Sequence, residues 1–393
     1  MIREFRYLAV GVGSLVLTQA PLAQDLPFQY TEVAQLAEPW ALAFMPDGRV
    51  LVTERAGTLQ LVDVSDGSKI EITGVPEVAY GNQSGFGEVM LHPEYEDNGW
   101  IYFSYSEDID GRNSVLTVFR AKLEVGADGG QLVDHEDIWR QNPPINGGQY
   151  GMRIAFNDGY MFITVGDRMR EDPAQDMSTN IGKIVRLHYD GSVPDDNPFA
   201  DQGGVTAEIW SIGHRTPYGL AFDGNGQLWE TEMGPQGGDE LNMIVRGDNY
   251  GWPEVTNGVD YGGGPRPDHD TRPEFHPPSV FWVPSFSPSS LMFYDGDEFP
   301  EWQGDAFIGG LSGMGISRIE FDGETAVEAD RYAMNARIRG LIQGPDDAIW
   351  VIVDGGGAGG RGGFPCFCGR GGRGGGAAPA GPAAGSLLRL TAN

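Results

Sequence analysis

The chain has 393 residues, and its 56 acidic residues outnumber its 26 basic residues, which gives a formal net charge of −30. This charge repels the phosphates of nucleic acids and of anionic membrane surfaces, so we expect no nucleic-acid partner. The length suits either one large all-β domain or roughly two or three smaller domains.

The first 23 residues have the pattern of a secretory signal peptide. Basic residues precede a short apolar core at residues 8–17, and Ala20 and Ala23 are small residues that suit a cleavage site. The core is shorter than the roughly 20 apolar residues of a typical membrane-spanning helix. We therefore expect a periplasmic or secreted protein with no membrane insertion after cleavage, and a retained anchor is the alternative.

One pattern recurs after residue 26: an apolar strand, a turn typically of the Asp-Gly type, and a second strand rich in β-branched and aromatic residues. Its six copies lie at residues 43–53, 89–105, 153–165, 219–229, 290–309 and 341–353, and a further strand follows each copy. A four-stranded unit cannot bury both of its faces alone, whereas a ring of such units can. The pattern predicts an all-β fold, a six-bladed β-propeller that spans residues 26–393.

Two segments fall outside the repeat. A strand at residues 28–33 is placed to become the outer strand of the last unit, which would close the ring and remove a free sheet edge. Residues 355–385 are almost wholly Gly, Ala, Pro and Arg, which predicts a long insertion without a packed core. Cys366 and Cys368 lie in this insertion, and the sequence leaves their role open.

The most informative stretch runs from residue 208 to residue 252. It contains G-H-R-T-P-Y-G at residues 213–219 and E-M-G-P-Q-G-G-D-E-L-N at residues 232–242, and N-Y-G-W-P follows at residues 249–253. A guanidinium, free carbonyl oxygens and a carboxylate at strand ends suit an anionic ligand bridged by a hard cation such as calcium. The motifs resemble those of the soluble aldose sugar dehydrogenases of the glucose/sorbosone dehydrogenase family, which are six-bladed β-propellers that use pyrroloquinoline quinone (PQQ) and calcium.

The resemblance implies a set of contacts to PQQ. A glutamine in the turn at residues 81–89 contacts the quinone in the family, and paired arginines in an R-I-R motif suit the three carboxylates of PQQ. This chain has Thr216 where an asparagine is usual, and Ser312 where some members have a lysine. The cofactor-binding residues predicted in this way are Gln83, Arg215, Thr216, Ser312, Arg337 and Arg339.

The resemblance also implies two calcium sites. The backbone carbonyls of Gly234 and Pro235 would hold the calcium that binds the cofactor. Glu240 and the carbonyl of Tyr250 would hold a second, structural calcium. Carboxylate and carbonyl oxygens are the ligands that calcium prefers.

The catalytic position departs from the family pattern. Members have H-x-G-x-R-[LI]-x-F, in which the histidine takes the proton of the sugar hydroxyl, whereas residues 149–156 here read Q-Y-G-M-R-I-A-F. Arg153 is retained, and so is Asp167, which matches the acidic residue that supports the family's histidine. The base position is Gln149, and an amide does not accept a proton near neutral pH. Asp167 and His214 are the two candidates for a substitute base.

The leading prediction is a periplasmic quinoprotein oxidoreductase that oxidises an aldose sugar or related alcohol to the lactone with PQQ and calcium. One alternative is a catalytically impaired propeller that binds a sugar or PQQ without turnover, because the base is Gln149. A third interpretation is a calcium-dependent, lactonase-like hydrolase, which would need several carboxylates and asparagines around a central metal. The sequence leaves open which sugar and which electron acceptor are used, and whether the chain forms a homodimer.

Overall fold

The computed structural model describes residues 25–81, 83–126, 129–323, 325–355 and 384–393. The predicted signal peptide, most of the Gly-rich insertion and both cysteines lie outside these residues. Regular structure in the described residues is almost entirely β-strand, so the predicted all-β class is confirmed. In the part of the chain that the structure describes, helical structure is limited to α1 (Tyr95–Asn98) and five short 3₁₀-helices at Asp172–Ala174, Ala200–Gln202, Gly204–Glu208, His269–Thr271 and Pro300–Trp302. Among the described residues, no helix has the length and apolar character needed to cross a membrane.

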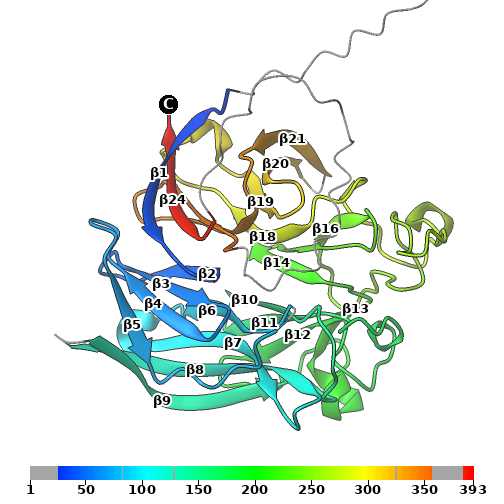
Figure 1. Cartoon of the computed structure of the whole chain (residues 1–393). Helices are drawn as coiled ribbons and strands as arrows, with labels where there is room; N and C mark the ends of the chain where they lie inside the picture. Colours follow the sequence, from blue (N-terminus) through cyan, green and yellow to red (C-terminus); the bar gives the residue numbers. More distant parts are fainter. Residues whose placement is uncertain (1–24, 82, 127–128, 324, 356–383) are drawn as a thin grey trace, which may run out of the picture.

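Four sheets have four antiparallel strands each, and their strands are arranged around a common centre (Figure 1). The first contains β10 (Gly151–Asn157), β11 (Tyr160–Val165), β12 (Lys183–His188) and β13 (Ile209–Ile212). The second contains β14 (Pro217–Phe222), β15 (Leu228–Glu232), β16 (Asp239–Met243) and β17 (Val280–Trp282). The third contains β18 (Pro288–Phe293), β19 (Ala306–Gly310), β20 (Gly315–Asp322) and β21 (Thr325–Ala333). The fourth contains β22 (Ile338–Gln343), β23 (Ile349–Val353), β24 (Ser386–Ala392) and β1 (Phe28–Gln35).

The fifth sheet has eight strands. One antiparallel run contains β2 (Pro39–Phe44), β3 (Val50–Glu54), β4 (Thr58–Val62) and β5 (Lys69–Thr73). The other contains β6 (Phe86–Leu91), β7 (Trp100–Asp108), β8 (Ser114–Gly126) and β9 (Gly129–Arg140). A short parallel pair between β5 and β9 joins the two runs, so this sheet is also built from four-stranded units.

The N-terminal strand belongs to the last sheet. β1 pairs with β24 in antiparallel register, from Phe28 opposite Ala392 to Gln35 opposite Ser386, and Figure 1 shows the two strands side by side. Phe28 anchors β1 because its buried ring meets the rings of Trp302 and Tyr332 edge-on. The predicted use of the early strand to cover the edge of the last sheet is confirmed.

The first strand of each four-stranded run shares one burial pattern. The first four residues of every such strand are buried, whereas an outer strand such as β21 alternates between exposed and buried positions. Continuous burial is typical of strands that are covered on both faces. The strands contact one another in a closed cycle: β2, β6, β10, β14, β18, β22 and back to β2. These first strands therefore form the common centre of the fold.

Candidate functional site

The predicted functional residues come mainly from two sets of loops. One set precedes the first strand of each four-stranded run, and the other connects its second and third strands. Because neighbouring strands are antiparallel, the start of the first strand and the end of the second strand lie at the same end of each sheet, and so do both sets of loops. The first set carries or adjoins Gln83, Gln149, Arg215, Thr216 and Arg337, and the second carries Asp167, Gly234, Pro235 and Ser312. Chain topology thus brings residues from distant parts of the sequence to one end of the fold.

Hydrogen bonds link these loops from each run to the next. A backbone N–H donates in every case, and the six bonds connect the runs in cyclic order. They are Phe86 N–Arg55 O (3.0 Å), Gln149 N–Gln83 Oε1 (2.6 Å), Asp167 N–Arg215 O (2.8 Å), Phe286 N–Asp239 Oδ2 (2.7 Å), Met334 N–Met314 O (3.0 Å) and Leu36 N–Gly385 O (2.8 Å). The loops at this end therefore support one another and hold their side chains in defined positions.

Two buried arginines have unused hydrogen-bonding capacity. Arg215 donates from Nη1 to the carbonyls of Met233 (2.8 Å) and Gly234 (2.7 Å), but its Nε has no partner among the described residues. Arg339 donates from Nη2 to Asp354 Oδ1 at 3.3 Å, and its Nε also lacks a partner in the described part of the chain. A buried donor without an acceptor costs about 1–3 kcal/mol, and more when it is charged. The two guanidinium groups therefore fit a ligand with several carboxylates.

The other predicted cofactor contacts differ in exposure. Arg337 is exposed and donates from Nε to Asp354 Oδ2 at 2.9 Å. Gln83 and Ser312 are also exposed, and the Ser312 hydroxyl donates to the carbonyl of Ser285. Thr216 is buried, and its backbone N–H donates to Glu232 at 3.1 Å, so its immediate role is in the packing of the turn that carries Arg215.

Gln149 is buried in a constrained loop. Its φ is 52°, in the left-handed region, and its side chain oxygen has no hydrogen-bond partner among the described residues. Gly166 lies beside it, and a Cβ there would collide with the carbonyl oxygen of Gln149. The close approach at Gly166 brings the Gln149 loop next to Asp167. The family's base position is therefore occupied by a fixed amide whose acceptor is free to receive a hydroxyl donor.

Asp167 corresponds to the residue that supports the catalytic histidine in the family, but here it has other hydrogen-bond partners and a raised pKa. Its Oδ2 accepts from Trp252 Nε1 at 2.8 Å and its Oδ1 accepts from the N–H of Met169 at 2.8 Å. Burial raises the pKa of Asp167 to about 6, and the charge of Arg215 opposes this rise. A carboxylate with this pKa can accept a proton near neutral pH.

His214 is fully buried and stacks on the ring of Tyr250, with 4.8 Å between the ring centroids. Its Nε2 lies 2.8 Å from Ser211 Oγ. His214 and Asp167 are both almost fully buried, but Asp167 adjoins the loop of Gln149, the family's base position, so it is the better placed of the two candidate bases.

Arg153, predicted as part of the catalytic set, lies at the centre of the first strands. It forms a buried ion pair with Glu88, with 3.0 Å between Nη1 and Oε2. Its remaining contacts reach the carbonyls of Tyr218 (2.7 Å from Nε), Ser289 and Arg339 (3.4 Å from Nη2), and its guanidinium lies 4.1 Å from the ring centroid of Trp40. One side chain of β10 thereby contacts β2, β6, β14, β18 and β22, which is the arrangement of a structural cation.

Glu240 and Tyr250, predicted as ligands of a structural calcium, line one small cavity together with Glu232. The cavity has a volume of about 10 Å³, close to the minimum that holds one water molecule. Burial raises the pKa of Glu240 above its ordinary value, and Glu232 contributes in the same direction. Clustered buried carboxylates of this kind are stabilised by a bound cation.

Gly234 lies at the edge of the same cavity, and Pro235 follows it. The carbonyl of Gly234 accepts one hydrogen bond from Arg215 and keeps a second lone pair for a cation. The predicted calcium ligands are thus brought together in one region.

Comparison with known proteins decides the family. Residues 36–360 match the family model described as glucose/sorbosone dehydrogenase. The chain belongs to this family. It is 36% identical over 328 residues to the aldose sugar dehydrogenase YliI of Escherichia coli, and the alignment covers 81% of this chain and 88% of that protein.

Solved structures agree with this assignment. The crystal structure of the soluble aldose sugar dehydrogenase from Escherichia coli, in its apo-form, has a TM-score of 0.80 at 32% identity, covering 93% of this chain and 100% of that one. The PQQ-bound form of the aldose sugar dehydrogenase from Streptomyces coelicolor has a TM-score of 0.71 at 28% identity, covering 95% and 100%. The resemblance seen in the sequence motifs is confirmed.

Sequence reasoning missed three residues at this end of the glucose/sorbosone dehydrogenase fold. Asp354 bridges Arg337 and Arg339; burial would raise the pKa of Asp354, but the two arginines outweigh it and hold the pKa below its ordinary value. Trp252 donates to Asp167 and lies under Arg215. Arg55 has a buried Nε that forms no hydrogen bond among the described residues and lies 3.7 Å from Glu38 Oε2 in an ion pair. Only Trp252 belonged to a recognised motif, and nothing local in the sequence marks the other two.

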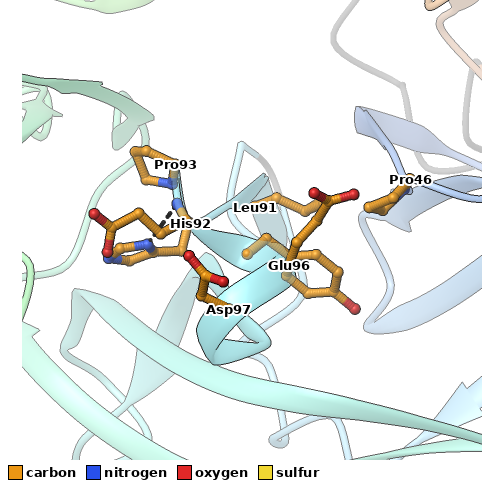
Figure 2. A pocket seen from close by; sticks show the side chains of 8 residues that line it. Pro46, Leu91, His92, Pro93, Glu96 and Asp97 are labelled. Atoms are coloured by element: carbon orange, nitrogen blue, oxygen red, sulfur yellow. Dashed lines mark hydrogen bonds between the residues drawn. The ribbon is translucent and has the colours of Figure 1, made fainter.

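A larger pocket of about 380 Å³ lies elsewhere, around α1 (Figure 2). It is lined by Pro46, Leu91, His92, Pro93 and the four residues 94–97. The residues come from the opposite ends of β2 and β6 to those that carry the family motifs. This pocket therefore does not belong to the candidate site.

Proposed function

We propose that this member of the glucose/sorbosone dehydrogenase family is a PQQ- and calcium-dependent dehydrogenase that oxidises an aldose sugar or a related alcohol to the lactone. The observation that carries the proposal is the pair of buried guanidinium groups, Arg215 and Arg339, whose Nε donors lack a partner in the described part of the chain. They lie at the end of the fold that holds the other family motifs. A relative of this chain has been solved in its PQQ-bound form.

We also propose that the fold is a six-bladed β-propeller. Two facts support this count: the closed cycle of first strands and the division of the eight-stranded sheet into two antiparallel runs. Pairing of β1 with β24 would then close the ring through the last blade.

We assign the binding of PQQ and its calcium, and the positioning of the sugar, to the following residues of this chain. Arg215, Arg337 and Arg339 bind the carboxylates of the cofactor, and the carbonyls of Gly234 and Pro235 hold its calcium. When bound, PQQ supplies the quinone that accepts a hydride from the sugar. The side-chain oxygen of Gln149 accepts a hydrogen bond from the sugar hydroxyl and orients it. Since an amide does not take up the proton, another residue must act as the base.

Asp167 can accept the proton of the sugar hydroxyl near neutral pH, since its pKa is about 6 and it is then largely ionised. We assign it the role of substitute base. Arg153 receives a structural role, because its nitrogens are committed to Glu88 and to the backbone of the first strands.

The remaining assignments rest on sequence. The N-terminal pattern supports export to the periplasm or outside the cell, and the acidic surface charge agrees with a small sugar as ligand rather than nucleic acid. An electron acceptor would complete the reaction, and the residues of this chain do not identify it.

The second candidate function is a propeller that binds PQQ or a sugar without turnover. Gln149 favours it, since the family's base is absent and Asp167 is itself only 1% exposed. The lactonase-like interpretation loses support because the centre of the first strands is filled by Arg153, where such a hydrolase would need converging metal ligands.

The test is reconstitution of the purified chain with PQQ and calcium. Binding is followed by the cofactor's absorption spectrum, and turnover by a panel of aldoses with an artificial electron acceptor. Arg337→Met, which removes a guanidinium paired with Asp354, is compared with Arg389→Met, which removes a similarly exposed guanidinium paired with Asp346. We expect binding to weaken only in the first variant. PQQ binding without turnover of any sugar would support the second candidate, and absence of PQQ binding would refute the dehydrogenase and leave only the sugar-binding form of the second candidate.

A further inference from the structure

Three buried carboxylates share one face of the sheet formed by β15 and β16. Glu230 lies opposite Asn242, and Glu232 lies opposite Glu240, so all four side chains stand next to one another. Their exposed fractions are 0% for Glu230 and Asn242, 4% for Glu232 and 5% for Glu240. No arginine or lysine forms an ion pair with Glu230 or Glu232 among the described residues. The charge of this face is therefore not balanced by a permanent cation of the chain.

His214 closes over the same face and has an unused nitrogen. Its Nδ1 is 3.7 Å from Glu232 Oε1 and 4.0 Å from Glu230 Oε2. Both distances are too long for a hydrogen bond, and Nδ1 has no partner in the described part of the chain. Two ligand atoms that share one zinc ion at about 2.0–2.2 Å lie roughly 3.3–4.0 Å apart. The spacing therefore matches atoms that face a common ion.

The groups around these three ligands are arranged as in protein metal sites. His214 Nε2 lies 2.8 Å from Ser211 Oγ, and a hydrogen bond donated to this hydroxyl leaves the lone pair of Nδ1 facing the carboxylates. Glu232 Oε2 accepts the backbone N–H groups of Arg215 and Thr216, which turns Oε1 towards His214. Each ligand is thus oriented by a second partner.

Glu230 completes the set. Its Oε2, the oxygen that faces His214, accepts from Asn242 Nδ2 at 3.1 Å and keeps a further lone pair for an ion, and its Oε1 is fully buried with no partner among the described residues. An oxygen of this kind is costly to bury unless something binds it.

We propose that His214, Glu230 and Glu232 bind a divalent transition-metal ion of the zinc class at a structural site inside the second four-stranded sheet. One imidazole nitrogen and two carboxylates are a ligand set that zinc and neighbouring metals accept, whereas calcium takes oxygen ligands. Two carboxylates and a divalent ion have no net charge, which removes the cost of burying the charges alone. The ion fixes Glu232 and, through it, the turn that carries Arg215.

This site is distinct from the calcium sites proposed above and does not rest on the dehydrogenase function. The structural calcium is assigned to Glu240 and the carbonyl of Tyr250, both oxygen donors. Glu240 Oε1 faces another side chain, His269 Nε2, at 3.3 Å. The transition-metal site borders the structural calcium site, because Glu232 lies opposite Glu240 and lines the same cavity, but its other two ligands are His214, which supplies nitrogen, and Glu230.

The experiment uses the full chain, stripped of metal and then titrated with Co²⁺ in the presence of excess calcium and without PQQ. The visible absorption bands of Co²⁺ report nitrogen ligation, and mass spectrometry of the metal content gives the stoichiometry. We expect one bound Co²⁺ per chain, displaced by Zn²⁺. Loss of Co²⁺ binding is expected in Glu230→Gln and His214→Gln, and weakening of about 10–100-fold in Ser211→Ala. Glu208→Gln, which changes a partly buried glutamate outside the cluster, is the matched control and keeps wild-type binding.

Glu230→Gln is expected to fold, so loss of metal binding in this variant cannot be ascribed to misfolding. It keeps the shape of the side chain and removes a buried charge, so the metal-free variant is expected to melt at or above the temperature of the metal-free wild type while losing the increase that Zn²⁺ produces. Wild type that binds no Co²⁺ in excess calcium would overturn the proposal and leave the cluster as a proton-sharing or calcium-binding group. Unchanged Co²⁺ binding in Glu230→Gln and His214→Gln would overturn it as well.

Discussion

Removal of the guanidinium of Arg153 tests whether one cation holds the centre of the fold together. Arg153→Met keeps most of the apolar stem and removes every polar contact of the side chain. It leaves the buried carboxylate of Glu88 without its ion-pair partner, and it leaves the carbonyls of Tyr218 and Ser289 without this donor. The side chains of Arg153 and Glu88 are 8% and 10% exposed, so water replaces little of what is lost.

The expected loss of unfolding free energy follows from the burial of the ion pair between Arg153 and Glu88. Breaking a buried ion pair by removal of one partner costs about 3–5 kcal/mol, because the remaining charge is not compensated. Burial raises the pKa of Glu88, and Arg153 acts against this rise. Without Arg153 the carboxyl takes up a proton more readily in the native state than in the unfolded state. Unfolding free energy of the variant is therefore expected to fall as the pH rises above the ordinary pKa of glutamate, and to recover in acid.

The assay is urea unfolding followed by tryptophan fluorescence, for wild type, Arg153→Met, Glu88→Gln and the double variant. We expect a positive coupling of about 0.5–3 kcal/mol, so that the double variant is less destabilised than the sum of the single variants. Arg389→Met removes an exposed pair with Asp346 and is expected to change stability by only about 0–1 kcal/mol. An effect of Arg153→Met no larger than that of Arg389→Met would refute the structural role.

Three further predictions concern the site. Gln149→His is expected to raise aldose turnover by about 10²–10⁴-fold, because it restores a base at the family position; equal kcat values in both forms would contradict this. If Asp167 is the substitute base, kcat/KM rises with pH through an apparent pKa near 6, since only the ionised carboxylate accepts a proton, and Asp167→Asn abolishes this limb; a pH profile unaffected by the substitution would exclude the role. Calcium is expected to raise the melting temperature of wild type and not of Glu240→Gln, because it binds the native state; calorimetry that shows the same increase in both proteins would place the calcium elsewhere.

Much of the fold could be predicted from the sequence because its signals are local. Apolar strands separated by Asp-Gly turns recur throughout the chain, and the strand count alone assigns residues 28–33 to the last sheet. The family motifs at residues 213–219, 232–242 and 249–253 likewise depend on side chains that lie close together in sequence. Local periodicity and turn chemistry therefore indicated the all-β class, and the resemblance of the motifs to those of the glucose/sorbosone dehydrogenases indicated the family.

The tertiary structure decided the roles that depend on contacts between distant residues. Arg153 has the same sequence context whether it is catalytic or structural, and only the convergence of six first strands around it favours the second role. His214 is a candidate substitute base in the sequence, but the structure buries it with Nδ1 at 3.7 Å from Glu232 Oε1 and 4.0 Å from Glu230 Oε2. Burial and electrostatic environment are properties of the assembled sheets, since they depend on which strands pack together, and so no single segment of the sequence contains them.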